Sequence, residues 1–183
     1  GGGDMWHLPL NKEQCTQLVN NSLFFDHVDS TALGHIFIPL EQFDGKVSSL
    51  YPVDASGWEE DAVYGYEELV GGISGLSKYG VLGSYINGDV YIGEMELLIS
   101  KEDTFSFVYT TGPRTMGQVI KIFDVEEETE QLIQEINLEV SHSAWKVAVI
   151  KNNYDGRMLK YKLVDGSDQW GEWTGYRVPN ANK

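Results

Sequence analysis

Acidic side chains are concentrated in the stretch FDVEEETEQLIQEINLEV, which runs from Phe123 to Val140 and contains no Lys or Arg. Carboxylates that have no cations beside them in the sequence are either solvated or available to a positively charged partner. The composition of this stretch therefore supports two interpretations, a solvated surface and a binding surface for a basic protein.

The apolar residues of the same stretch follow the spacing of one helical face. Val125, Leu132, Ile136 and Val140 fit the repeat of an amphipathic helix that packs on a core. Asp124 is the predicted N-cap, and the glutamates directly after it lie in the first turn, where the helix dipole favours carboxylates. The sequence therefore predicts a helix over the whole stretch.

The helix dipole does not explain the acidic residues farther along, because its effect fades within one turn. On a helical wheel, Leu138 lies on the side opposite the apolar face, among outward-pointing carboxylates. We therefore expect Leu138 to be an exposed anchor in a partner-binding surface. The charged members of that predicted surface are Glu127, Glu130 and Glu135.

A second cluster combines aromatic and acidic residues in the sequence SGWEEDAVYGYEE. Aromatic side chains supply anchors at protein interfaces, and carboxylates pair with a cationic partner. The candidate binding residues in this cluster are Trp58, Glu59, Glu60 and Asp61. Asp61 is also the predicted cap of a short helix, which accounts for part of the acidity.

The sequence contains no recognisable catalytic or metal-binding motif. The segment GGISGLSKYG lacks the spacing of a phosphate-binding loop, and neither a G-x-S-x-G elbow nor an H-E-x-x-H pair occurs. Glu94 and Glu96 share one face of a predicted strand, where a solvated face explains them better than acid-base chemistry does. The four histidines are scattered, and Cys15 is the single cysteine. We therefore expect no enzyme activity, no metal and no cofactor.

The composition narrows the class of partner. The chain has 183 residues, a formal net charge of −15 and a sequence pI near 4.5. Such a charge repels phosphate backbones, so direct nucleic-acid binding is disfavoured and a basic protein is the expected partner. No apolar run approaches the roughly 18 residues of a membrane span, and the start of the chain lacks the pattern of a signal peptide. Together with the single cysteine, these features favour a cytoplasmic protein that does not bind membranes.

The rest of the sequence predicts strands, turns and short helices. Helices are expected after Asn11 and from Asp61, and Pro39 is expected either to place the strand of ALGHIFIPLEQF at a sheet edge or to end it. Asn87-Gly88 predicts a two-residue hairpin turn with positive φ at both residues. Alternating apolar residues predict further strands at 81–86, 89–100, 104–110, 118–123, 144–151 and 157–164.

These elements predict an α+β fold, an antiparallel β-sheet meander flanked by helices. Residues 1–60 are expected to form an N-terminal helix and strand segment with a loop, and residues 61–183 the α+β core domain. The two parts could also form one compact domain.

From about Glu67 onward, the order of the predicted elements resembles that of YezG-type immunity proteins of bacterial polymorphic toxin systems. The likeness is carried by the Trp-led strand that begins at Trp145, by the turn at Asp155-Gly156, and by Tyr161 in the following strand. The resemblance implies a non-enzymatic, cytoplasmic protein that binds and blocks a toxin domain, often a nuclease. The first sixty or so residues are not covered by it.

Two alternative functions remain open at this point. An acidic protein can act as a nucleic-acid mimic against a defence protein, which predicts carboxylates spaced like phosphates across much of the surface. An extracellular carbohydrate-binding or structural module is the other alternative, because Trp170, Trp173 and Tyr176 lie close together in the sequence DQWGEWTGYRV. A terminal strand that covers the core with its aromatic residues explains the same pattern and is the favoured interpretation.

Overall fold

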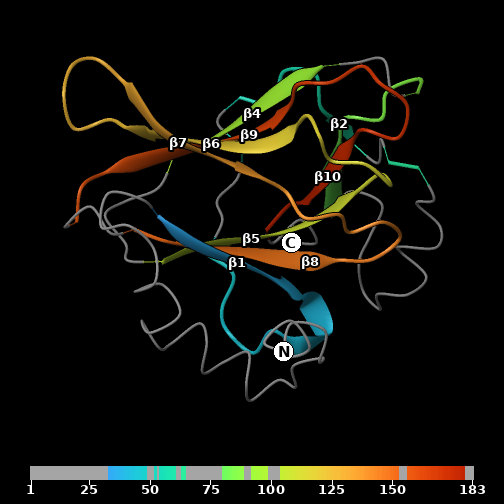
Figure 1. Cartoon of the computed structure of the whole chain (residues 1–183), viewed down its shortest axis with the longest axis horizontal. Helices are drawn as coiled ribbons and strands as arrows, with labels where there is room; N and C mark the ends of the chain where they lie inside the picture. The colour runs from blue at the N-terminus through green and yellow to red at the C-terminus, as the bar shows by residue number, and fades with distance from the viewer. Residues whose placement is uncertain are drawn as a thin grey trace, which may run out of the picture.

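The computed structural model shows two antiparallel β-sheets that pack face to face (Figure 1). The structure describes residues 33–48, 52, 54–60, 63–64, 80–88, 92–98, 104–152 and 156–179. Within these ranges the helical residues are those of η3 (Leu40–Gln42), a single 3₁₀ turn, and Gly80 in 3₁₀ conformation directly before β3. The predicted α+β class is therefore wrong, since both layers of the described part are β-sheets and no helix flanks them.

The larger sheet has six strands in the order β1-β8-β5-β10-β3-β2, and all neighbours are antiparallel. Its strands are β1 (Gly34–Pro39), β2 (Glu59–Glu60), β3 (Val81–Gly83), β5 (Thr104–Thr111), β8 (Lys146–Lys151) and β10 (Thr174–Arg177). Both β1 and β2, from the first sixty residues, pair with strands from later in the chain.

The smaller sheet has four antiparallel strands in the order β4-β9-β6-β7. Its strands are β4 (Gly93–Leu98), β6 (Gln118–Asp124), β7 (Gln131–Asn137) and β9 (Leu159–Asp165). Burial alternates along β6, where Ile120 and Ile122 face inward and Lys121 faces outward. One face of this sheet therefore packs on the core and the other faces solvent.

The main core lies between the two sheets. Phe105, Phe107 and Tyr109 of β5 share one buried face, as the sequence predicts. The rings of Phe105 and Tyr161, from opposite sheets, stack with their centroids 4.3 Å apart. These aromatic contacts bury large apolar surfaces and hold the sheets together.

Strand β8 is buried on both faces, because the six-stranded sheet has a second apolar cluster on its other side. Ala148 and Ile150 belong to the core between the sheets, whereas Val147 and Val149 pack with Trp173 in the second cluster. The continuous apolar run VAVI is typical of a strand covered on both sides.

The helix predicted over residues 124–140 is wrong, because this stretch contributes the turn and second strand of a β-hairpin formed by β6 and β7. The register shifts between Ile122 and Phe123, where β7 contains one extra residue. As a result, the inward-facing residues Ile133 and Ile136 are three positions apart. A bulged strand therefore reproduces the spacing of a helical face.

The turn at Asn87-Gly88 has the predicted backbone conformation, with φ of 53° and 107°. The hairpin predicted around it is wrong, because β3 and β4 belong to different sheets. Strands β8 and β9 also belong to different sheets, so the predicted meander is interrupted at both places. The chain crosses from one layer to the other where the sequence suggests simple hairpins.

Other predictions concern the N-terminal part of the chain. β1 ends at Pro39 and forms an edge of its sheet, as predicted. The helix predicted after Asn11 lies outside the described residues, as do most residues of the helix predicted from Asp61.

No helix within the described ranges has the length and apolar character needed to cross a membrane.

Candidate functional site

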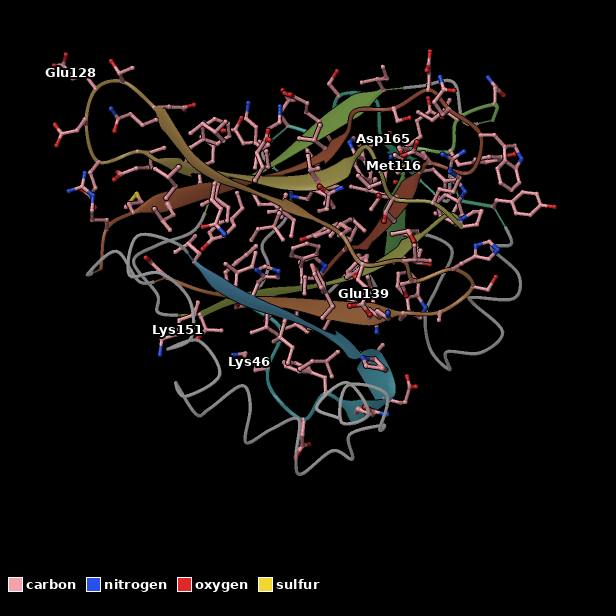
Figure 2. The ribbon with its side chains drawn as sticks, viewed as in Figure 1. Lys46, Met116, Glu128, Glu139, Lys151 and Asp165 are labelled. Atoms are coloured by element: carbon pink, nitrogen blue, oxygen red, sulfur yellow. The ribbon has the colours of Figure 1, made fainter. Side chains whose placement is uncertain are left out.

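The loop between β6 and β7, residues 125–130, carries four of the seven acidic residues of the stretch from Phe123 to Val140. It extends beyond the end of the four-stranded sheet (Figure 1). Figure 2 shows Glu128 at the far end of this loop, away from the two sheets. We refer to residues 125–130 as the acidic loop.

The base of the acidic loop is fixed by Asp124. Its carboxylate accepts a hydrogen bond from the backbone N–H of Glu126 at 3.0 Å, which forms a turn rather than a helix cap. The same carboxylate accepts two hydrogen bonds from the Arg157 guanidinium, at 2.6 and 3.2 Å. These bonds hold the pKa of Asp124 below its ordinary value. The loop therefore has a charge-assisted anchor at its start.

A second anchor holds the end of the acidic loop. The ammonium group of Lys160 pairs with Glu96 at 3.0 Å and also contacts Glu130. Burial alone would lower the pKa of Lys160, but its hydrogen bonds with Glu130 and Glu96 raise it. The carboxylate of Glu130 thus serves an internal ion pair between the loop and the sheet.

The tip of the acidic loop presents charge outward. The side chain of Glu127 is 77% exposed, and its contact with Arg157 is long, at 3.8 Å. Glu128 is exposed and forms no ion pair with a described residue. These two carboxylates are therefore the members of the loop that are available to a partner.

Glu135, the third predicted acidic residue, lies on the outer face of the four-stranded sheet. It faces Lys121 of β6 at 3.8 Å and is half exposed. On the same face, Lys162 pairs with Glu94 at 3.5 Å. The predicted solvated face of Glu94 is therefore part of a surface on which charges of both signs alternate.

Leu138 is not the exposed anchor that the helical wheel predicts. Its side chain is 2% exposed and belongs to the core between the sheets. Its backbone N–H donates to the oxygen of Gln118 at 2.9 Å. Leu138 therefore contributes to folding and offers no surface to a partner.

The second candidate cluster is divided by the fold. Trp58 is buried in the main core, whereas Glu59 and Glu60 are exposed on β2. Asp61 lies outside the described residues. Strand β2 ends the six-stranded sheet, far from the acidic loop (Figure 1). The two predicted clusters therefore do not form one surface.

The three aromatic residues near the C-terminus do not form a common platform. Trp170 is 71% exposed, whereas Trp173 and Tyr176 are buried. The favoured interpretation, aromatic residues covering the core, is confirmed for Trp173 and Tyr176. Because Trp173 and Tyr176 are buried, a sugar cannot stack across all three rings.

A buried polar cluster at the other end of β6 was not anticipated from the sequence. Asp165, which ends β9, accepts hydrogen bonds from Ser84 and from Gln118, each at 2.7 Å. Burial raises the pKa of this carboxyl to about 6. Figure 2 places Asp165 on the side of the molecule opposite Glu128. The sequence gives no signal for the cluster, because its members are separated by tens of residues.

The chemistry available at the acidic loop is the pairing of carboxylates with cations. Within the described part of the chain, no group of three or more His, Cys, Asp or Glu side chains could hold a metal ion. No family model, curated protein or solved structure matches this chain. The functional argument therefore rests on the residues themselves.

Proposed function

We propose that this chain is a non-enzymatic, cytoplasmic binding protein that presents its acidic loop to a basic protein. The partner class that agrees with the sequence resemblance is a nuclease-like toxin domain, which the chain would block as an immunity protein. A nuclease needs a basic surface to hold nucleic acid, and carboxylates placed on that surface exclude the substrate.

One observation carries this proposal: a loop with a fixed base exposes two carboxylates at its tip, Glu127 with only a long ion pair and Glu128 with no ion pair to a described residue. Arg157 and Lys160 hold the two ends of the loop, so the tip is positioned before a partner arrives. Preorganisation lowers the entropy lost on binding. Glu127 and Glu128 then lie where a basic surface can approach, because both are exposed and the ion pair of Glu127 with Arg157 is long, at 3.8 Å.

The nucleic-acid mimic is less well supported by this arrangement. A mimic needs free carboxylates over much of its surface, whereas Glu94, Glu96 and Glu135 on the four-stranded sheet each pair with a lysine. Lysines placed among these carboxylates interrupt a phosphate-like pattern.

The test compares two double variants that remove the same charge from different places. Glu127→Gln with Glu128→Gln neutralises the loop tip, and Glu59→Gln with Glu60→Gln neutralises two exposed residues on β2. Binding is measured by surface plasmon resonance at low and high salt against a basic nuclease toxin domain, which is sought among the genes that neighbour the one for this chain. We expect the loop variant to associate several-fold more slowly at low salt and to lose salt dependence, because exposed interface charges act mainly through steering.

The β2 variant is the control for net charge and should change the association rate much less. Equal slowing by both variants would show that total charge, not the loop, governs association. A wild-type chain that leaves the nuclease fully active at equimolar concentration would overturn the inhibitor function itself.

A further inference from the structure

Among the residues that the structure describes, one edge of the four-stranded sheet, β7, has no strand paired with it on its outer side. The opposite edge, β4, is covered by residues 54–57, because the N–H groups of Glu94 and Glu96 donate to the oxygens of Ser56 and Asp54 at 2.9 and 2.7 Å. In the other sheet, β2 has only two residues and β1 ends in a proline. β7 has seven residues and contains neither proline nor lysine, the residues that commonly protect an edge.

The backbone of β7 directs hydrogen-bonding groups outward at two defined positions. The backbone N–H of Leu138 donates to the backbone oxygen of Gln118, which begins β6. In an antiparallel pair every second residue bonds to the neighbouring strand, so the residues of β7 that bond toward β6 follow in steps of two from Leu138. By this alternation, Glu135 and Asn137 point their N–H and C=O groups toward the open edge. Among the described residues, no backbone group bonds to them there.

Carboxylates outnumber cations around this edge. From Ile122 to Trp145 the sequence contains no Lys or Arg, while Glu130, Glu135 and Glu139 lie on or beside β7. These three glutamates pair with Lys160, Lys121 and Lys146 of other strands, whereas the exposed tip of the acidic loop adds negative charge next to the start of β7. The exposed side chains of β7 include Leu132, which is 51% exposed. The edge therefore combines backbone groups that no described backbone group pairs with, an excess of negative charge and one exposed apolar side chain.

We infer that β7 is the docking edge for an extended, basic segment of the partner, which adds to the four-stranded sheet as a fifth strand. The inference rests on the proposed function, since it assigns a binding mode to the same basic partner. Main-chain hydrogen bonds supply affinity in this mode, and alternate side chains supply specificity. A Lys or Arg of the segment lies opposite Glu135, and an apolar side chain lies beside Leu132.

The direct test uses a synthetic peptide of alternating lysine and valine as the probe. Amide exchange is followed by NMR in the full chain, with and without the peptide. We expect the Glu135 and Asn137 amides to exchange rapidly in the free protein and to slow at least tenfold when the peptide is bound. A peptide of the same sequence with N-methyl groups on alternate residues keeps the charge but loses donors, and it should give no such protection.

Two variants separate the backbone from the charge. Glu135→Gln removes the carboxylate and keeps the N–H, whereas Glu135→Pro removes both. Proline is tolerated at an edge position whose N–H faces solvent, so the fold should persist. We expect Glu135→Pro to bind the peptide about threefold to tenfold more weakly than Glu135→Gln, the worth of one hydrogen bond.

Several results would overturn the inference. Equal affinity of the two Glu135 variants, or of the two peptides, would show that binding is electrostatic only, which leaves the proposed function intact. Slow exchange of both amides in the free monomer would show that another segment of the chain covers β7. Protection that appears only with rising protein concentration would assign the edge to a second copy of the chain. If neutralising Glu127 and Glu128 leaves the association rate and its salt dependence unchanged, the proposed function is refuted instead.

Discussion

Replacing Asp165 by Asn should remove a specific pH dependence from the stability of this protein. One carboxylate oxygen of Asp165 accepts from the Ser84 hydroxyl at 2.7 Å. The other accepts from the Gln118 amide at 2.7 Å and from the backbone N–H of Ser167 at 3.1 Å. Glu172 lies close enough for its charge to raise the pKa further. The group is fully buried where the two sheets meet.

The magnitude follows from the raised pKa of Asp165, about 6 against an ordinary value of 3.8. Because the pKa is higher in the folded state, the native protein holds this proton more tightly than the unfolded chain does. Stability should therefore fall as the pH rises from about 4 to about 6 and then stay level. The difference corresponds to on the order of 2 to 3 kcal/mol at neutral pH.

Asn has the shape of Asp without its charge, so it avoids this cost. Its oxygen can accept the bonds from Gln118 and Ser167, and its amide can donate to Ser84. The Ser84 hydroxyl already lies 3.3 Å from the Thr174 oxygen, to which it can then donate. We expect Asp165→Asn to be about 1 to 2 kcal/mol more stable than the wild type at pH 7.5, since part of the gain is lost in readjusted hydrogen bonds.

The assay is urea denaturation of both proteins between pH 4 and pH 8. The informative quantity is the difference between their free energies of unfolding at each pH, because other carboxylates cancel in it. Asp124, for example, has a lowered pKa, and its contribution disappears only as the pH falls below its ordinary range. Asp168→Asn, at an exposed position three residues along, is the control and should leave the pH profile unchanged. A constant difference between Asp165→Asn and wild type across this range would refute the reasoning.

Two further predictions concern packing and backbone geometry. Leu138→Ala should lower the free energy of unfolding by about 2 to 4 kcal/mol, because Leu138 is buried in the core. Leu132→Ala, at an exposed position, should change it by less than about 1 kcal/mol. Equal effects of the two variants in urea denaturation would contradict the core position of Leu138. Gly57→Ala should lower the melting temperature more than Gly156→Ala does. Both glycines have positive φ, but only at Gly57 would an added Cβ lie 2.5 Å from the Gly93 Cα. Similar losses of melting temperature for the two variants would argue against that close approach.

Local patterns in the sequence predict several strands correctly and fail where distant segments decide the outcome. The alternation of Phe105, Phe107 and Tyr109 predicts a strand with one buried face, and the structure confirms it. The positive φ of Asn87 and Gly88 is also local, because it depends on what these residues tolerate. Which sheet the next strand joins is not local, so the predicted hairpin there is wrong.

The acidic stretch illustrates the same limit at the candidate site. Asp124 forms a local turn where a helix cap was expected, and a single extra residue in β7 gives the apolar positions a helical spacing. The partners of the stretch are Lys160 of β9 and Arg157, two residues before that strand, each about thirty residues later in the sequence. The sequence identifies the acidic residues, but only the fold shows which carboxylates are paired and which are free.

The interior position of β10 determines when this protein can complete its folding. β10 lies between β5 and β3, although its residues, 174–177, follow every other strand that the structure describes. While the ribosome is still adding residues, β5 and β3 can be present but have no strand to join them. The six-stranded sheet then exists as two separate parts with exposed edges, a state that favours aggregation. Until β10 has emerged, the edges of β5 and β3 can therefore pair with other chains instead.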